Sequence, residues 1–285
     1  MSQEPLELLP FEKWSELQTM FKADWPRGIS GYTVLETQRV LIEKGGNYGF
    51  KVYCPFGDLR SGMVAVNVKD TFHEIIVLCP QDDTEKLEGA LTRTKIVNLQ
   101  EYDVIPFAPY HVRQCVQRVL GEHVKLKLMS TDAFIYDKPT TFTGNDMPEG
   151  ISFGILSSEH LDLVDSKWPY RYDSSRWYLN LMINVKFGYG LFEGGKLIAW
   201  VLLNESGALL NLYTLESHRK KGYAELIVKL VSNILVKEGK PVVAFCIKGN
   251  ENGRKLYEKL GFLNTHSVEW CFLNNKFISL LDVYY

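Results

Sequence analysis

The stretch that decides the fold is Leu212-Tyr-Thr-Leu-Glu-Ser-His-Arg-Lys-Lys-Gly-Tyr-Ala224, which joins a strand-like apolar run to a long amphipathic segment. Residues 219–224 fit the pattern Arg/Gln-x-x-Gly-x-Gly/Ala, in which successive backbone amides converge on one point at the start of a helix. Small side chains at Gly222 and Ala224 let a ligand approach the backbone. The stretch predicts an anion-binding loop, against the alternative of a solvated basic turn.

Strands and helices alternate around this loop. Strand-like runs at residues 189–193, 197–203 and 208–215 are separated by Gly194-Gly195 and by Asn204-Glu-Ser-Gly207, which predicts two hairpins before the loop. A helix over residues 222–237, a buried strand over 242–247 and a helix over 250–260 follow it. This order predicts an α/β fold of the α+β kind, with a mixed twisted sheet flanked by helices.

A second motif lies downstream: Asn250-Glu-Asn-Gly-Arg-Lys-Leu-Tyr-Glu-Lys-Leu-Gly-Phe262. Together the two motifs resemble the GCN5-related N-acetyltransferase superfamily, whose ligand is an acyl coenzyme A. The resemblance implies that the backbone of the preceding strand pairs with pantetheine and that the loop holds the pyrophosphate. The residues concerned are Leu212, Tyr213 and Thr214 in the strand, and Arg219, Lys220, Lys221, Gly222, Tyr223 and Ala224 in the loop.

The resemblance also assigns roles in the second motif. Asn250 matches a cofactor-binding asparagine, and Tyr257 matches a tyrosine that protonates the departing thiolate. From the residue types alone, two other roles are equally open. Asn250 could be a helix N-cap, and Tyr257 could be a core side chain with its hydroxyl bonded to backbone.

Three further stretches are similar to the glycine N-acyltransferase family: Ile76-Val-Leu-Cys-Pro-Gln81, Leu163-Val-Asp-Ser-Lys-Trp-Pro-Tyr170, and residues 177–200 with Phe192-Glu-Gly-Gly195. Those enzymes pair a degenerate N-terminal acetyltransferase-like domain with a complete C-terminal one. The resemblance implies two such domains here, at residues 1–140 and 150–285. The run at 137–150, rich in Pro, Gly and Thr, is the linker candidate.

One departure from that family concerns the base. Its catalytic glutamate is replaced by Ala208 at the matching position. Glu205, in the hairpin turn just upstream, is the candidate replacement, against its interpretation as an exposed turn acid. Deprotonating a lysine-like amine at pH 7 costs about 4.6 kcal/mol, whereas deprotonating a peptide α-amine costs about 1 to 1.4 kcal/mol. Without a base, acceptors of low pKa are therefore favoured.

These features predict an acyl-CoA-dependent N-acyltransferase with Tyr257 and Glu205 as candidate catalytic residues. Its donor is acyl-CoA or acetyl-CoA, no metal takes part, and its acceptor is a small amine, glycine or another amino acid above all. Two alternatives stay open. One is a protein or polyamine N-acetyltransferase on the same scaffold, and the other is a non-catalytic acyl-CoA-binding module, which Ala208 favours.

Composition limits the other partners. The chain has 285 residues, enough for two domains, and its 32 Lys and Arg against 34 Asp and Glu give a formal charge of −2. We therefore expect no nucleic-acid partner, and the short apolar runs predict no integral membrane association.

The zinc-binding spacings His-Glu-x-x-His and Cys-x-x-Cys do not occur in the sequence. Apolar surroundings predict buried, reduced thiols and an intracellular location, cytoplasmic or mitochondrial, without a legible targeting signal. These thiols belong to Cys54, Cys79, Cys115, Cys246 and Cys271.

The first half of the chain is less distinctive. Thr33, with Glu36 three residues later, predicts a helix start by the capping-box pattern. Strand-like runs follow at residues 50–54, 63–68 and 74–79. Further strands at 124–128 and 134–136 are expected to complete this half.

Overall fold

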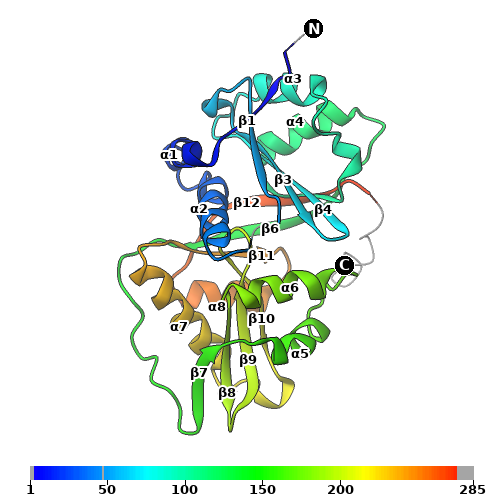
Figure 1. Cartoon of the computed structure of the whole chain (residues 1–285). Helices are drawn as coiled ribbons and strands as arrows, with labels where there is room; N and C mark the ends of the chain where they lie inside the picture. The colour runs from blue at the N-terminus through cyan, green and yellow to red at the C-terminus, as the bar shows by residue number, and fades with distance from the viewer. Residues whose placement is uncertain (1–2, 47, 275–285) are drawn as a thin grey trace. The chain divides into compact units, whose positions relative to one another are not determined.

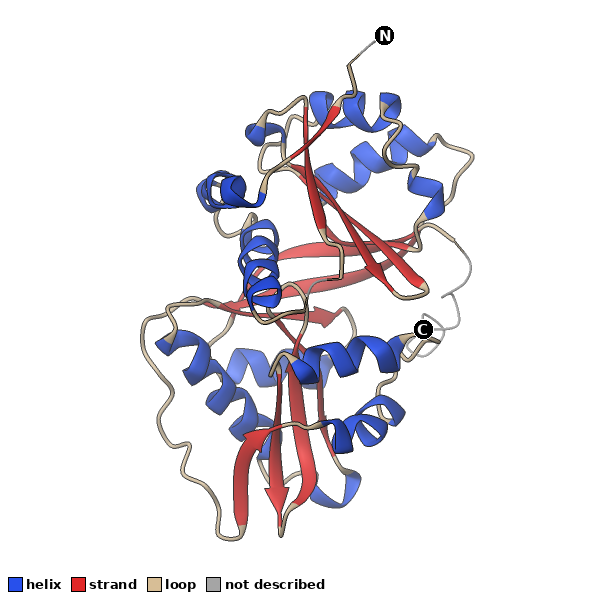
Figure 2. Ribbon diagram, viewed as in Figure 1, coloured by secondary structure: helices blue, strands red, loops and turns tan. Residues whose placement is uncertain are grey.

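The computed structural model describes residues 3–46 and 48–274 of the chain. Two compact units are present (Figure 1), and each is a sheet flanked by helices (Figure 2). Unit 1 holds residues 3–43, 48–132 and 266–274, and unit 2 holds Lys44–Gly46 and Ala133–Thr265. These units are defined by contacts, so the domain limits predicted at 140 and 150 stay a prediction.

Unit 1 is built on strands in the order β1-β2-β3-β4-β5-β12. They are β1 (Leu6–Leu8), β2 (Lys51–Pro55), β3 (Met63–Lys69), β4 (Phe72–Leu78), β5 (Val104–Ala108) and β12 (Leu263–Phe272). Its helices are α1 (Trp14–Ala23), α2 (Ile29–Glu43), α3 (Glu85–Arg93) and α4 (Tyr110–Leu120), with 3-10 turns at Phe11–Lys13, Leu59–Ser61 and Leu99–Glu101. Strands β4 and β5 are parallel, and fully buried Ile75, Leu87 and Val112 lie in the core that joins the strands to α3 and α4.

Unit 2 has the strand order β6-β11-β10-β9-β8-β7. The strands are β6 (Lys127–Tyr136), β7 (Ile151–Ile155), β8 (Gly188–Glu193), β9 (Lys196–Leu203), β10 (Ala208–Thr214) and β11 (Val242–Ile247). The helices are α5 (Leu161–Ser166), α6 (Ser175–Asn184), α7 (Tyr223–Lys237) and α8 (Glu251–Lys259), with 3-10 turns at Ser158–His160 and Glu216–His218. Neighbouring strands from β7 to β10 are antiparallel, whereas β10 and β11 are parallel.

Two strands each contribute to both units. The unit boundary falls between Asp132 and Ala133 within β6, and between Thr265 and His266 within β12. The last strand in the order of unit 1, β12, therefore comes from the C-terminal half of the sequence, and the first strand in the order of unit 2, β6, comes from the N-terminal half. The two strands predicted at 124–128 and 134–136 are one strand, β6, and its residues 133–136 belong to unit 2, so that part of the prediction is wrong.

The predicted helix start at Thr33 is also wrong, because α2 begins at Ile29. The Thr33 hydroxyl donates to the carbonyl of Ile29 at 2.9 Å inside a helix that is already running. The chain turns tightly before α2: a Cβ on Gly28 would lie 2.0 Å from the carbonyl oxygen of Phe21. The capping-box pattern is present, but the close turn at Gly28 sets where the helix starts.

The long helix after the loop is confirmed as α7. Leu226, Ile227 and Val231 are buried on its apolar face, and Gly239, with φ of 72°, follows its end. The helix packs against β8, β9, β10 and β11, and Figure 1 shows it to the left of the unit 2 strands, with α5 to their right. This packing fixes the start of α7 beside the end of β10.

Candidate active site

Strand β10 separates from its parallel neighbour, β11, after its first two residues. Ala208 lies opposite Val243 and Leu209 opposite Ala244, and among the described residues the pairing of β10 with β11 stops there. On its other side, the register between β10 and β9 shifts between Leu210 and Tyr213, which places one extra residue on β10. A bulge of this kind bends a strand, so β10 turns away from β11 and leaves one backbone edge open to a ligand.

The bulge combines a left-handed backbone conformation at Asn211 with two buried polar side-chain atoms, on Asn211 and Thr214. Asn211 has φ of 51°, in the left-handed region that a non-glycine residue seldom adopts. Its side-chain Nδ2 is buried without a hydrogen-bond partner among the described residues, and the same holds for Oγ1 of Thr214. Buried polar atoms are nearly always hydrogen-bonded in folded proteins. Two such atoms on one short strand therefore indicate a polar ligand at the bend.

The predicted anion loop ends at the start of α7. Gly222 is the N-cap in the left-handed conformation, with φ of 83°, and no side chain of the described residues caps the helix. The first helical hydrogen bond runs from Leu226 N to Gly222 O at 3.0 Å. The backbone amides of Tyr223, Ala224 and Glu225 precede that bond and have no helical acceptor. An uncapped helix start of this kind binds anions through its amides and its dipole.

Cationic side chains surround this helix start. Arg219, Lys220 and Lys221 are exposed, and Lys220 has φ of 62°. Arg219 is held in place because its Nε lies 3.4 Å from Thr214 O and its guanidinium lies 5.5 Å from the ring of Tyr213. Tyr213 in turn stacks on buried Trp200, with 4.9 Å between ring centroids. The first cation of the loop is thus tied to the end of β10.

Asn250 and Tyr257 lie on α8. Asn250 is the N-cap, and its Oδ1 accepts a hydrogen bond from Gly253 N at 3.0 Å, which realises the capping role left open by the sequence. Tyr257 is buried, with its ring 5.6 Å from that of Phe134 and 5.4 Å from that of Phe262. Burial raises the pKa of the Tyr257 phenol, so it remains a protonated donor.

Glu205 occupies an unexpected environment. Its interpretation as an exposed turn acid is wrong, because only 4% of the residue is exposed. The hydroxyl of Tyr178, on α6, donates to its Oε2. Ala208 itself is fully buried in the paired part of β10. Glu205 is therefore buried and hydrogen-bonded.

The remaining acids and the cysteines have ordinary surroundings. Glu193 is exposed and lies 3.2 Å from Nε2 of His218, in the 3-10 turn before the loop. All five cysteines are buried and none forms a disulfide bond, as their apolar surroundings predict. In the part of the chain that the structure describes, no group of three or more His, Cys, Asp or Glu side chains is placed to hold a metal. Over the same residues, no helix has the length and apolar character to cross a membrane.

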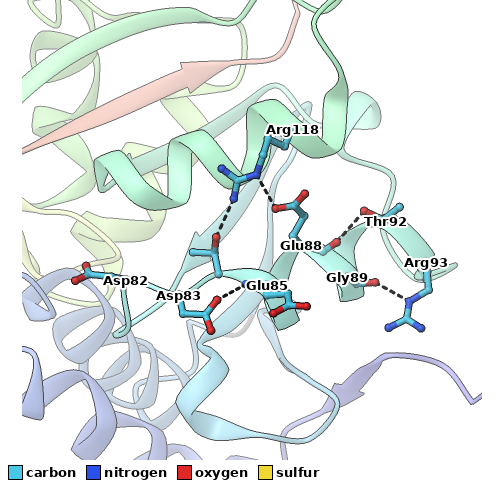
Figure 3. A pocket seen from close by; sticks show the side chains of 9 residues that line it. Asp82, Asp83, Glu85, Glu88, Gly89, Thr92, Arg93 and Arg118 are labelled. Carbon is cyan, nitrogen blue, oxygen red and sulfur yellow. Dashed lines mark hydrogen bonds and ion pairs between the residues drawn. The ribbon is translucent and has the colours of Figure 1, made fainter.

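Unit 1 carries a separate cavity of about 550 Å³ at the start of α3 (Figure 3). Four carboxylates line it: Asp82, Asp83, Glu85 and Glu88. Arg118, from α4, donates to Glu88 at 2.7 Å and to Oγ1 of Thr84 at 3.1 Å. Carboxylates outnumber the two arginines in the lining, so this cavity disfavours an anion.

Comparison with known proteins agrees with the geometry of unit 2. Residues 188–271, from β8 into β12, match the family described as FR47-like protein. A structure from Drosophila has 17% identity and a TM-score of 0.82, covering 96% of this chain and 100% of its own. The chain has the fold of the GCN5-related N-acetyltransferases. The predicted fold class is thereby confirmed.

Two further solved structures carry that superfamily's name. The GCN5-related N-acetyltransferase from Sphaerobacter thermophilus has 11% identity and a TM-score of 0.55, covering 93% of this chain and 94% of its own. A tandem GNAT protein from the clavulanic acid biosynthesis pathway has 12% identity and a TM-score of 0.53, covering 94% and 96%. No curated protein matches the chain in sequence.

Two features of the site had no clear sequence signal. The bulge at Asn211 rests on one residue in a left-handed conformation, which asparagine tolerates but does not require. The partner of Glu205, Tyr178, lies 27 residues earlier in the chain. A buried acid is recognisable from a sequence only when its partner is local.

Proposed function

We propose that this protein is an acyl-CoA-dependent N-acyltransferase, which moves an acyl group from coenzyme A to the amine of a small acceptor. The observation that carries the proposal is the uncapped start of α7, with three cationic residues beside it, at the end of a strand that bends away from its parallel neighbour. Coenzyme A has phosphates at one end and an amide-bearing arm leading to the thioester. We assign its pyrophosphate to residues 219–224 and its arm to the open edge of β10 at residues 212–214.

The unpartnered polar atoms of β10 support this assignment. The buried Nδ2 of Asn211 and Oγ1 of Thr214 match the hydrogen-bonding groups of an arm that carries two amides. Asn250 caps α8 and so fixes the helix that carries Tyr257, and we propose that it also contacts the cofactor. No step of this proposal needs a metal.

In the proposed reaction, the neutral amine of the acceptor attacks the carbonyl carbon of the thioester. A backbone amide at residues 212–214 donates to the carbonyl oxygen as negative charge develops there. The carbon–sulfur bond then breaks, and Tyr257 gives its proton to the thiolate sulfur. The attacking nitrogen loses one proton to a base, and the products are an amide and free coenzyme A.

The acceptor we propose is glycine or another free amino acid. The support is the similarity of three stretches of this sequence to glycine N-acyltransferases, residues 76–81, 163–170 and 177–200. One observation favours a second candidate, a non-catalytic acyl-CoA-binding module: Ala208 stands where those enzymes carry their base. The two candidates differ in whether acyl-CoA is consumed.

The test is a matrix of donors and acceptors. Acetyl-CoA, benzoyl-CoA and a longer acyl-CoA are each mixed with free amino acids, a polyamine, or peptides, and released thiol and acylated product are measured by absorbance and mass spectrometry. We expect amide products with free amino acids. Faster acylation of peptides or polyamines would contradict the acceptor assignment, and micromolar binding of CoA with no product would establish the binding module instead.

A further inference from the structure

Three side chains of unit 2 form a hydrogen-bonded row just before the anion loop. Oγ of Ser217 lies 2.8 Å from Nδ1 of His218, and Nε2 of His218 lies 3.2 Å from Oε2 of Glu193. Ser217 and His218 belong to the 3-10 turn Glu216–His218, and Glu193 is the last residue of β8. The imidazole therefore bridges a hydroxyl and a carboxylate.

The carboxylate determines which nitrogen of His218 carries the proton. A carboxylate only accepts hydrogen bonds, so Nε2 of His218 is the protonated nitrogen, and it donates to Glu193. In the neutral imidazole Nδ1 is then the acceptor, and the Ser217 hydroxyl donates to it. A serine that donates to an imidazole, which is itself oriented by a third group, is the arrangement that activates a hydroxyl as a nucleophile.

The serine is accessible, whereas the imidazole is largely enclosed. Ser217 is exposed, but only 16% of the His218 side chain is exposed. The His218 ring lies 6.3 Å from the ring of Tyr223, the first residue of α7, and its backbone nitrogen donates to Leu215 O at 2.8 Å. A substrate can therefore reach the hydroxyl while the ring keeps its position.

A second row of the same residue types has a different bonding pattern. Oγ of Ser157 lies 3.0 Å from Nδ1 of His160, but the Ser157 hydroxyl donates to Oε1 of Glu159 at 2.7 Å. Nδ1 of His160 accepts from the backbone nitrogen of Ser157 at 3.0 Å, as part of a capping box. The imidazole acceptor is thus occupied by backbone there. Among the described residues, the Ser217 hydroxyl bonds His218 alone.

We propose that Ser217 and His218, positioned by Glu193, form a catalytic site for the hydrolysis of carboxylic esters, separate from the acyl transfer proposed above. The Ser217 oxygen attacks the ester carbonyl carbon as its proton passes to Nδ1 of His218. The carbon–oxygen bond of the ester breaks, and the alcohol leaves with that proton. Water then attacks the acyl-serine and gives a proton to His218, and the carboxylic acid leaves as this proton returns to the Ser217 oxygen. Glu193 acts through the imidazole, so it is a positioning residue.

The charges beside Ser217 favour one class of ester. Exposed Glu216 precedes the serine, and three exposed cations follow it within four residues: Arg219, Lys220 and Lys221. An excess of cations beside a reaction site attracts anionic substrates and stabilises the negative charge that develops on the carbonyl oxygen. We therefore expect esters that carry a carboxylate or a phosphate to react faster than neutral esters. No step uses CoA, so the inference does not depend on the proposed cofactor.

The experiment measures ester hydrolysis in the absence of CoA. The two substrates carry the same acetyl group: 4-nitrophenyl acetate, which is neutral, and 4-acetoxy-3-nitrobenzoate, which is anionic. Release of the nitrophenolate is followed by absorbance for the wild type, Ser217→Ala, His218→Gln, Glu193→Gln and the matched control Ser157→Ala. Peptide mass spectrometry locates the acetyl group, and hydroxylamine distinguishes acetyl-serine, which it cleaves, from acetyl-lysine, which it does not. Thermal melts confirm that each variant is folded.

We expect Ser217→Ala and His218→Gln each to lower kcat/KM by about 100-fold or more. The double variant should be no slower than either single variant, because a nucleophile and its base act as a unit. Glu193→Gln should lower kcat about fivefold with KM unchanged, and should have no further effect in the Ser217→Ala background. The anionic ester should have a kcat/KM about tenfold above that of the neutral ester. Ser157→Ala should behave like the wild type.

Any of three results would overturn the proposal. They are a wild type no faster than the uncatalysed reaction, equal rates for the wild type and Ser217→Ala, and an acetyl group that resists hydroxylamine on Lys220 or Lys221 with none on Ser217. An effect of Glu193→Gln that persists in the Ser217→Ala background would refute the role of Glu193. Each of these results leaves the acyltransferase proposal standing, because that reaction is measured separately with acyl-CoA and amines.

Discussion

Reversing the charge of Arg219 is the most direct perturbation of the anion loop. The side chain is exposed and packs on Tyr213 at the end of β10, so Arg219→Glu leaves the core of unit 2 intact. Exposed substitutions of this kind usually change the free energy of unfolding by less than about 0.5 kcal/mol. Any larger effect on ligand binding therefore reports the loop itself.

The expected loss of affinity follows from the charges involved. A hydrogen bond to a charged group contributes about 1.5 to 3 kcal/mol, and an exposed ion pair nearer to 1 kcal/mol. The substitution removes an attraction at the lower end of this range and replaces it with a repulsion of similar size. We expect the binding free energy of CoA to fall by about 2 to 3 kcal/mol, or about 30- to 160-fold in affinity.

The assay is titration calorimetry with CoA, and the matched control is Lys237→Glu at the other end of α7. Both substitutions change the net charge equally. The 15 residues of α7 separate the control from the loop by about 20 Å, more than twice the Debye length at physiological salt. We expect the control to bind like the wild type. Equal affinities for Arg219→Glu and Lys237→Glu would refute the assignment of the pyrophosphate to this loop.

Substitutions at three other positions test α8 and its junction with α7. Asn250→Ala removes the cap bond to Gly253 and should lower the free energy of unfolding by about 1 kcal/mol in urea, whereas Asn250→Asp should keep most of it. Tyr257→Phe should lower kcat about tenfold without changing CoA affinity, because a thiolate of pKa near 8.5 leaves with little help. Complete loss of turnover would contradict that role. Hydrogen bonds from Lys259 and Lys229 lower the pKa of Glu225, so the stabilisation is present above its unfolded-state pKa and is lost as pH falls through the lower folded-state pKa. Glu225→Gln should therefore lower the melting temperature at pH 7 and not near pH 2.

The parts of the fold that the sequence predicts are those determined by short stretches of the chain. The period of apolar residues along α7 and the Gly and Asn turns between β8, β9 and β10 each depend on a short window of the chain. The turn before α7 is equally local, because Gly222 must adopt a left-handed conformation just where the helix starts, whereas the binding of an anion there stays a prediction. Prediction succeeds there because the residues that form the feature are neighbours.

The parts that the sequence does not predict depend on distant partners. Apolar runs predict strands over parts of β6, but such a run does not determine which strand lies beside it, so the sequence does not predict that β6 contributes to both units. Glu205 has the local context of an exposed turn, and only the arrival of Tyr178 from α6 buries it. Both misses concern tertiary contacts that override a correct local pattern.

The two units explain why the chemistry is assigned to one of them. Both contain a strand, a helix and a parallel strand in succession: β4-α3-β5 in unit 1 and β10-α7-β11 in unit 2. Before α3 the loop reads Cys79-Pro-Gln-Asp-Asp-Thr84, and Asp83 already accepts a hydrogen bond from Glu85 N at 2.9 Å. The amide that would meet a phosphate is thus taken by the protein's own carboxylate, whereas the amides at the start of α7 are left to a ligand among three cations. We therefore assign the anion site to unit 2, because the loop before α3 supplies its own negative charge at its first helical amide and the loop before α7 does not.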